Sequence, residues 1–121
     1  MIAIHSKRMS QVTLIEPEHR RGYISHTNIE TELTYTRIYS IVNKYLSENE
    51  VVVEWFDRFT FEWSVTKRLS EGDVVDARIR VWSSSSSSYI IEVNRQEGPH
   101  IEFNELFEGL KSEIEESSQI G

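Results

Sequence analysis

The chain shows two kinds of hydrophobic periodicity, first the spacing of a helix and then the alternation of strands. Five apolar residues are spaced 3, 1, 3 and 1 positions apart and so follow one stripe of a helix: Ile38, Ile41, Val42, Tyr45 and Leu46. Thr27 and Glu30 have the spacing of a capping box, and Asn49 is a residue at which helices often end. The pattern predicts a helix over about residues 29–47.

Four segments after this helix have the composition or the alternation of β-strands, namely residues 51–56, 59–66, 74–82 and 89–93. In the second segment the odd-numbered residues from Phe59 to Val65 are apolar, and in the third those from Val75 to Val81 are apolar. One apolar face per strand is typical of an antiparallel sheet that is covered on one side.

A second helical stripe follows "GP" and predicts a helix over residues 101–116, through Phe103, Leu106, Phe107, Leu110 and Ile114. Gly109 lies inside this stripe and weakens a helix by about 1 kcal/mol relative to alanine. The predicted fold class is therefore α+β, a two-layer sandwich with a four-stranded antiparallel sheet and two helices on one face. The predicted order is α-β-β-β-β-α.

Six consecutive serines separate the last two strand segments. A domain linker here would leave one strand and one helix, too little to bury a core, so we expect a hairpin loop over 83–88 inside a single domain at 27–117. We expect a partly ordered arm at 1–26 and a frayed tail at 118–121. The alternative for the run is a phosphorylation cluster: Ser83, Ser84, Ser85, Ser86, Ser87 and Ser88.

Composition narrows the function classes. The chain has 121 residues, no cysteine and a net charge of −7, and residues 96–121 hold seven Glu and one Lys, a sum of −6. An acidic chain argues against nucleic-acid binding, which needs a basic face. No apolar run approaches the length of a membrane span, and the lack of cysteine is compatible with a reducing interior, so we expect an intracellular, cytoplasmic protein.

Catalytic and metal signatures do not emerge from the sequence. The four histidines, His5, His19, His26 and His100, lack the spacing of a zinc site and are expected on the surface, and we expect no metal or cofactor. Glu54 and Glu62 have positions on adjacent strands that would suit a carboxylate pair. We favour the alternative that Glu54 and Glu62 lie on a solvated sheet face or form cross-strand ion pairs with Arg78 or Arg80.

Trp82 is the residue that most suggests a binding surface. It shares its side of the strand with Arg78 and Arg80, and Phe56 shares that face if Glu54 points outward. An exposed aromatic residue beside arginines is suited to contact a protein or an anionic group. The alternative is that Trp82 lies beneath residues 1–26.

The C-terminal half resembles the kinase-associated domains found at the ends of AMP-activated and MARK-type protein kinases. The resemblance lies in the strand from Tyr89 to Arg95, in Gly98, and in a closing helix with an early aromatic: Phe103, Leu106 and Leu110. The preceding helix and hairpin match those of the family in order and length, so the resemblance spans about residues 29–116. It implies a non-catalytic domain that binds partner subunits, a kinase domain or anionic phospholipids.

For lipid binding the resemblance implies four basic candidates, Arg58, Lys67, Arg68 and Arg95, with Arg78 and Arg80 as further ones. The acidic last helix disfavours an anionic membrane and favours a protein partner. We therefore predict a regulatory or protein-interaction module that uses the open sheet face or the groove beside the helices. The alternatives are a small acidic homodimeric chaperone and a small ligand-binding or enzymatic α+β domain.

Overall fold

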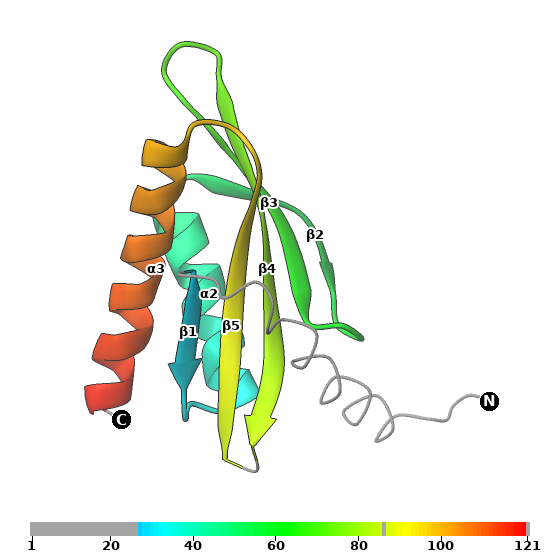
Figure 1. Ribbon diagram of the computed structural model, residues 1–121, viewed down its shortest axis with the longest axis vertical. Coiled ribbons are helices and arrows are strands. Elements are labelled where there is room, and N and C mark those ends of the chain that lie inside the picture. The colour runs from blue at the N-terminus through cyan, green and yellow to red at the C-terminus, as the bar shows by residue number, and fades with distance from the viewer. Residues whose placement is uncertain (1–26, 86, 121) are drawn as a thin grey trace, which may run out of the picture.

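The predicted succession of a helix, four strands and a helix is present, and a short strand precedes it. The structure is a computed structural model that describes residues 27–85 and 87–120. Along the chain the elements are β1 (Asn28–Thr31), α2 (Tyr35–Glu48), β2 (Val51–Asp57), β3 (Glu62–Arg68), β4 (Val74–Ser85), β5 (Ser88–Glu97) and α3 (His100–Ile120) (Figure 1). The α+β class and the antiparallel sheet are as predicted, but the described sheet has five strands and not four.

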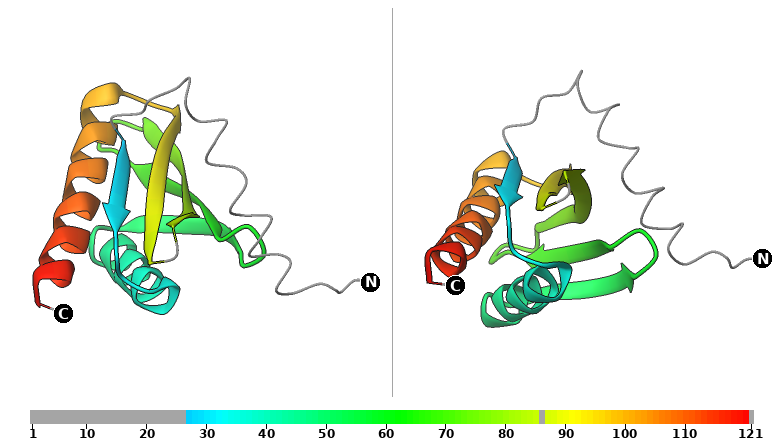
Figure 2. Two further views of the ribbon diagram at one scale, coloured as in Figure 1. Left: turned by 60° about the horizontal axis from the view of Figure 1, so that its bottom comes forward. Right: turned by 90° about the horizontal axis from the view of Figure 1, so that it is seen from below.

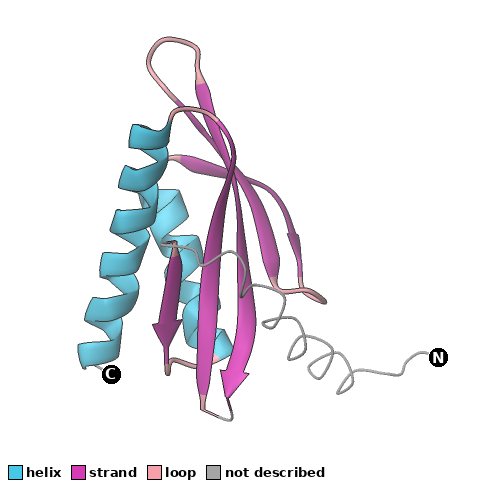
Figure 3. Cartoon of the chain, in the orientation of Figure 1, coloured by secondary structure: helices cyan, strands magenta, loops and turns pink. Residues whose placement is uncertain are grey.

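The sheet has the strand order β1-β5-β4-β3-β2, and every neighbouring pair is antiparallel. Strands β2 to β5 follow one another as a meander, whereas β1 lies at the far edge beside β5 (Figure 3). Helix α2 therefore carries the chain from one edge of the sheet to the other, and β2 and β1 are the two edge strands.

The fifth strand, β1, occupies residues that were predicted to begin the first helix. Ile29 pairs with Ile91 of β5 and is 2% exposed, so burial beside β5 outweighs the local helical signal. The helix begins later, with Thr34 as its N-cap, and the Thr34 hydroxyl accepts a hydrogen bond from the amide of Arg37 at 3.2 Å. The predicted capping box at Thr27 and Glu30 is therefore wrong.

Both helices pack on the same face of the sheet, which curves around them (Figure 2). The apolar side chains of β3 and β4 that point into this layer are at most 1% exposed, as the alternation predicts: Trp63, Val65, Val75, Ala77, Ile79 and Val81. The prediction is wrong for Phe59, which lies in the turn before β3 and is 59% exposed. The helices contribute the opposing stripe: Ile38, Val42, Leu46, Phe103, Phe107, Leu110 and Ile114. Burial of each large side chain stabilises the fold by about 1.5–3 kcal/mol, so this layer is the main source of stability.

The serine run lies at the tip of the β4–β5 hairpin. Strand β4 continues to Ser85, and Ser85 pairs with Ser88 at the start of β5, so the strands extend into the run that was predicted as a loop over 83–88. Ser86 and the arm predicted at 1–26 lie outside the described residues. Because β4 and β5 pair directly across the run, the serines connect two strands of one sheet.

Helix α3 is longer at its C-terminal end than the sequence predicted. It continues to Ile120, so residues 118–120, expected as a frayed tail, are helical. The Ser118 hydroxyl donates to the carbonyl of Ile114 at 3.0 Å and lies 3.3 Å from the Thr31 hydroxyl of β1. These contacts attach the last turns of α3 to the β1 edge. Neither described helix combines the length and the apolar composition that crossing a membrane requires.

Candidate functional site

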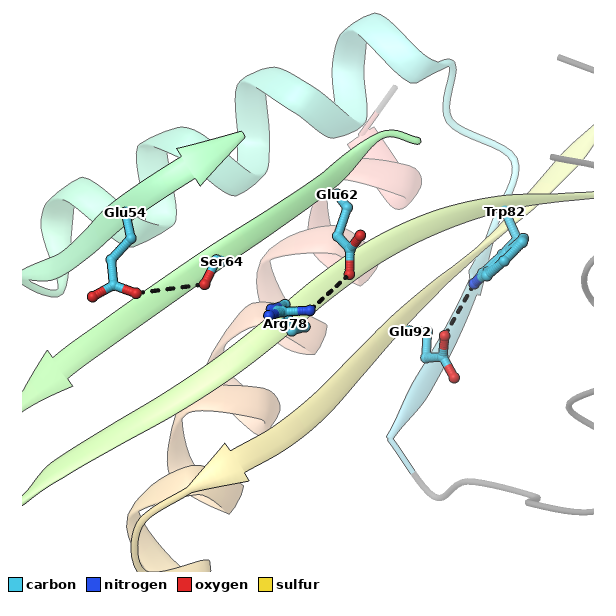
Figure 4. Close-up of polar contacts among 6 residues, drawn as sticks. All are labelled: Glu54, Glu62, Ser64, Arg78, Trp82 and Glu92. Atoms are coloured by element: carbon cyan, nitrogen blue, oxygen red, sulfur yellow. Dashed lines mark hydrogen bonds and ion pairs between the residues drawn. The ribbon is translucent and has the colours of Figure 1, made fainter. Parts of the chain in front are cut away.

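The sheet face opposite the helices, called the outer face below, carries the two arginines of the predicted partner site. The Arg78 guanidinium lies 5.1 Å from the ring centre of Trp55. It also lies 3.8 Å from a carboxylate oxygen of Glu62, an ion pair drawn in Figure 4. The Arg80 guanidinium lies 3.8 Å from the ring centre of Trp82. Both arginines therefore stack on indole rings of the same face.

Trp82 lies on the outer face but is not the exposed aromatic residue that the sequence predicted. Its side chain is only 1% exposed. The indole Nε1 donates to a carboxylate oxygen of Glu92 at 3.0 Å (Figure 4), and Arg80 covers the ring. The prediction of an exposed contact at Trp82 is therefore wrong. The alternative placement beneath residues 1–26 concerns a segment outside the described residues.

Phe56 does not share the outer face with Trp82, because the pairing of β2 with β3 shifts at Glu54. After this β-bulge Trp55 lies opposite Ser64, whereas Phe56 lies opposite Trp63 and points to the helix side. A bulge adds one residue to one strand and so reverses the side-chain alternation beyond it. The predicted position of Phe56 is therefore wrong, and Trp55 takes the outward place.

Strand β2 presents an exposed apolar row, which we call the apolar edge: Val52, Val53 and Trp55. Their side chains are 62%, 38% and 42% exposed. Among the described strands β2 pairs with β3 alone, so the other side of its backbone has no strand neighbour in this part of the chain. Exposed apolar edge strands are sites at which another strand pairs. The run of three valines signals a strand, but no local pattern reveals that this strand lies at an edge.

Glu54 and Glu62, considered above as a carboxylate pair, are held apart by different partners. The Ser64 hydroxyl donates to a Glu54 oxygen at 3.5 Å, and Glu62 forms its ion pair with Arg78 (Figure 4). The expected cross-strand ion pair is therefore present for Glu62. A general acid and base would need to share a reacting atom, and these two carboxylates face other residues.

The four basic residues considered for anion binding do not form one patch. Arg58 lies in the turn between β2 and β3, at one end of the sheet, with its guanidinium 5.4 Å from the ring centre of Phe59. Lys67 and Arg68 lie at the opposite end of β3, and the Lys67 ammonium donates to the carbonyl of Asn49 at 2.8 Å. The Arg95 guanidinium, on β5, donates to the carbonyl of Gly98 at 3.0 Å.

The serines of the run differ in their surroundings. Ser84 and Ser87 are exposed, whereas Ser88 is 9% exposed. The hydroxyls of Ser83 and Tyr35 lie 3.3 Å apart and share a hydrogen bond. Phosphorylation of the run stays a prediction, and Ser84 and Ser87 are the members whose described side chains are most accessible.

Metal-ligating groups were not expected, and the described part of the chain contains no cluster of three His, Asp or Glu side chains suited to hold a metal ion. His100 begins α3 and is exposed. The other three histidines, His5, His19 and His26, lie outside the described residues.

A cleft lined by aromatic side chains lies between the first turns of α2 and the β2–β3 hairpin. We call it the aromatic cleft, and its lining residues are Tyr35, Thr36, Tyr39, Phe56 and Phe61. Its volume is about 190 Å³, below the roughly 300–1,000 Å³ of sites that enclose drug-sized ligands. The cleft is an open depression that is too small to enclose such a ligand and has room for about one side chain.

The rings of the aromatic cleft hold one another in place. Tyr35 stacks on Phe61 with ring centres 4.6 Å apart, and Tyr39 contacts Phe56 at 5.1 Å. Trp63, which is fully buried, lies 4.8 Å from Phe56, and its Nε1 donates to the Asn43 side chain at 3.0 Å. Tyr39 remains 43% exposed, so the cleft has a fixed base and an accessible rim.

Phe61 has an unusual backbone conformation for an aromatic residue. Its φ angle is 55°, in the left-handed region, which costs about 1–3 kcal/mol for a residue other than glycine. The Phe61 carbonyl accepts a hydrogen bond from the amide of Val81 at 3.0 Å, which ties this turn to β4. The fold thus maintains a strained residue in the wall of the cleft, and strain of this kind clusters at binding sites.

No family model matches the chain, and no curated protein matches it significantly. The resemblance to kinase-associated domains therefore stays a prediction. The surfaces that remain as candidates are the apolar edge and the aromatic cleft, which β2 connects through Trp55 and Phe56.

Proposed function

We propose that this chain is a non-catalytic protein-interaction module whose partner adds an extended segment to the free edge of β2. The observation that carries the proposal is the exposure of Val52, Val53 and Trp55 along that strand, at 62%, 38% and 42%. Backbone N–H and C=O groups on the free side of an edge strand supply affinity to an added strand, and side-chain contacts supply specificity.

The bulge at Glu54 restricts which segments can pair with β2. Bulges and charged residues on an edge limit open-ended pairing between sheets, and β2 has both at its centre. The opposite edge, β1, is only four residues long and contacts α3 through Thr31 and Ser118. The two edges therefore differ, and β2 is the edge on which an added strand would find the longer, more apolar surface.

A regulatory role agrees with the resemblance to kinase-associated domains. That resemblance depends in part on the glycine between the last strand and the closing helix, Gly98. Gly98 has a φ angle of 107°, and a side chain there would collide with the backbone carbonyl of Val74. The position thus requires glycine for physical reasons. The acidic surface of α3 favours a protein partner over an anionic membrane.

The experiment selects binding peptides from a displayed random library with the full wild-type chain, then measures their affinity for variants. Val52→Lys and Trp55→Lys place a charge on the apolar edge. Ile101→Lys is the matched control, because Ile101 is an apolar residue of α3 that is 70% exposed. We expect both edge variants to weaken binding at least about ten-fold and the control to change it less than about two-fold, with reduced hydrogen exchange in β2 on binding.

Equal affinity of the selected peptides for wild type and both edge variants would contradict the proposal. Unchanged hydrogen exchange of the β2 amides in the peptide-bound chain would contradict it as well. Thermal unfolding of each variant verifies that the exposed substitutions leave the fold intact.

A further inference from the structure

The edge strand and its flanks are locally acidic. Residues 50–58 contain Glu50, Glu54 and Asp57 against Arg58 alone, so three negative charges and one positive charge leave −2. Glu50 and Glu54 are exposed. The whole chain has the same sign, with a net charge of −7.

Two basic side chains near β2, Arg78 and Lys67, already have acceptors or rings as partners, and Glu50, Glu54 and Asp57 form no ion pair within the described residues. Arg78 lies against Trp55 and Glu62, and the Lys67 ammonium donates to a backbone carbonyl. A segment that pairs with β2 therefore meets uncompensated carboxylates, and charge complementarity favours lysine or arginine in that segment. A second copy of β2 would instead bring like charges together, which disfavours it as the occupant.

The aromatic cleft lies on the helix side of the same strand. Side chains directly across two paired strands point to the same face, so an added strand alternates between two environments. Its outward residues would lie beside Val52 and Trp55. Its inward residues would lie beside Val53 and Phe56, and Phe56 is part of the cleft wall.

We propose that the segment bound by β2 is basic and inserts one large apolar side chain into the aromatic cleft. The inference rests on the proposed function, because it specifies the sequence class of the same partner. Three observations support it: the acidic flank of β2, the side-chain-sized cleft beside Phe56, and the strained backbone that holds Phe61 in the cleft wall.

The test uses three fluorescent nine-residue peptides with blocked ends and the full chain. The first alternates leucine with lysine, the second has alanine in place of every leucine, and the third has glutamate in place of every lysine. We expect the first to bind at least ten-fold more tightly than either of the others.

Variants of the chain assign each preference to its residues. Tyr39→Ser removes an exposed ring from the rim of the cleft, and we expect it to reduce the leucine-over-alanine preference to below three-fold. Glu50→Gln combined with Glu54→Gln should reduce the lysine-over-glutamate preference at least five-fold. Ile101→Ser is the matched control and should leave both preferences unchanged.

The outcomes separate this inference from the proposed function. If the alanine or the glutamate peptide binds as tightly as the first, with β2 amides protected, the anchor or the charge requirement is wrong while strand addition stands. Tyr39→Ser would also contradict the proposed apolar anchor if it weakened the leucine and the alanine peptides equally and so left the ratio of their affinities unchanged. If no peptide protects β2 and Val52→Lys has no effect, both proposals are wrong. A wild-type dimer that Val52→Lys converts to a monomer would make a second copy the occupant and overturn the inference.

Discussion

The hydroxyl group of Tyr45, on α2, lies directly where a side chain at Gly109, on α3, would begin. The same hydroxyl donates to the backbone carbonyl of Leu106 at 3.1 Å, one turn earlier in α3. Gly109 thus permits the close approach of the two helices that this hydrogen bond needs. The sequence pattern alone marks Gly109 as a weak point of a helix, whereas the packing makes it a requirement.

Gly109→Ala should therefore destabilise the chain, although alanine is the better helix former by about 1 kcal/mol. The new methyl group overlaps the Tyr45 ring and hydroxyl, and overpacking of this kind costs about 1–3 kcal/mol. Urea denaturation of both proteins measures the difference. Combining Gly109→Ala with Tyr45→Phe removes the hydroxyl, so the double variant should lose less than the two single changes add up to. An increase in stability for Gly109→Ala alone would refute the packing explanation.

Glu50→Gly should stabilise the chain by about 1 kcal/mol. Glu50 follows the helix C-cap Asn49 and has a φ angle of 59°, in the left-handed region that glycine adopts without steric cost. Glu50 is exposed, so its side chain loses little packing when it is removed. Glu48→Gly is the matched control, since Glu48 is the last residue of α2 and is also exposed. It should destabilise the chain by up to about 1 kcal/mol. The two shifts in denaturation midpoint should have opposite signs, and shifts of the same sign would contradict the prediction.

Trp82→Ala should cost about 3–5 kcal/mol of stability, as is typical when a buried tryptophan is truncated. The side chain is 1% exposed and donates to Glu92. Trp55→Ala should cost only about 1 kcal/mol, because Trp55 is 42% exposed on the same face. Thermal or urea unfolding of the two variants measures the difference. Equal losses would mean that Trp82 is as accessible as the sequence pattern suggested.

Stability should decrease as the pH rises above about 10, because burial raises the pKa of the Tyr45 phenol above its ordinary value of 10.0 and the charge of Glu113 adds to the effect. The unfolded chain releases this proton near the ordinary value while the folded chain retains it. The stabilisation is therefore complete below that pH and is lost as the pH rises through the folded-state pKa.

Urea midpoints at about pH 8 and about pH 11 measure this dependence. Burial also raises the pKa of Tyr35, although its hydrogen bond with Ser83 lowers it and the charge of Tyr89 raises it further. Tyr45→Phe should therefore reduce the loss between the two pH values without abolishing it. An unchanged loss in Tyr45→Phe would show that Tyr45 is not among the responsible groups.

Local periodicity was enough to predict several elements of the fold and their buried faces. Three predicted patterns bury the face that was expected: the helical stripe from Ile38 to Leu46, the alternation from Val75 to Val81 and the closing helix through Phe103. Each of these patterns repeats over several turns or residue pairs, so one buried face suffices to specify the element and its orientation. The polar face with Arg78 and Arg80 followed from the same alternation.

Other features depend on neighbours distant in sequence and could not be predicted from local patterns. Residues 28–31 form a strand because β5 offers a partner for Ile29, although their local pattern resembles a helix start. The bulge at Glu54 exchanges the sides of Trp55 and Phe56, because one extra residue reverses a period of two. Trp82 and Trp55 lie on the same face, yet Trp82 is buried and Trp55 is exposed. Trp55 is exposed because β2 is an edge strand of the described sheet, and strand order depends on pairing between segments distant in sequence, which no local pattern contains.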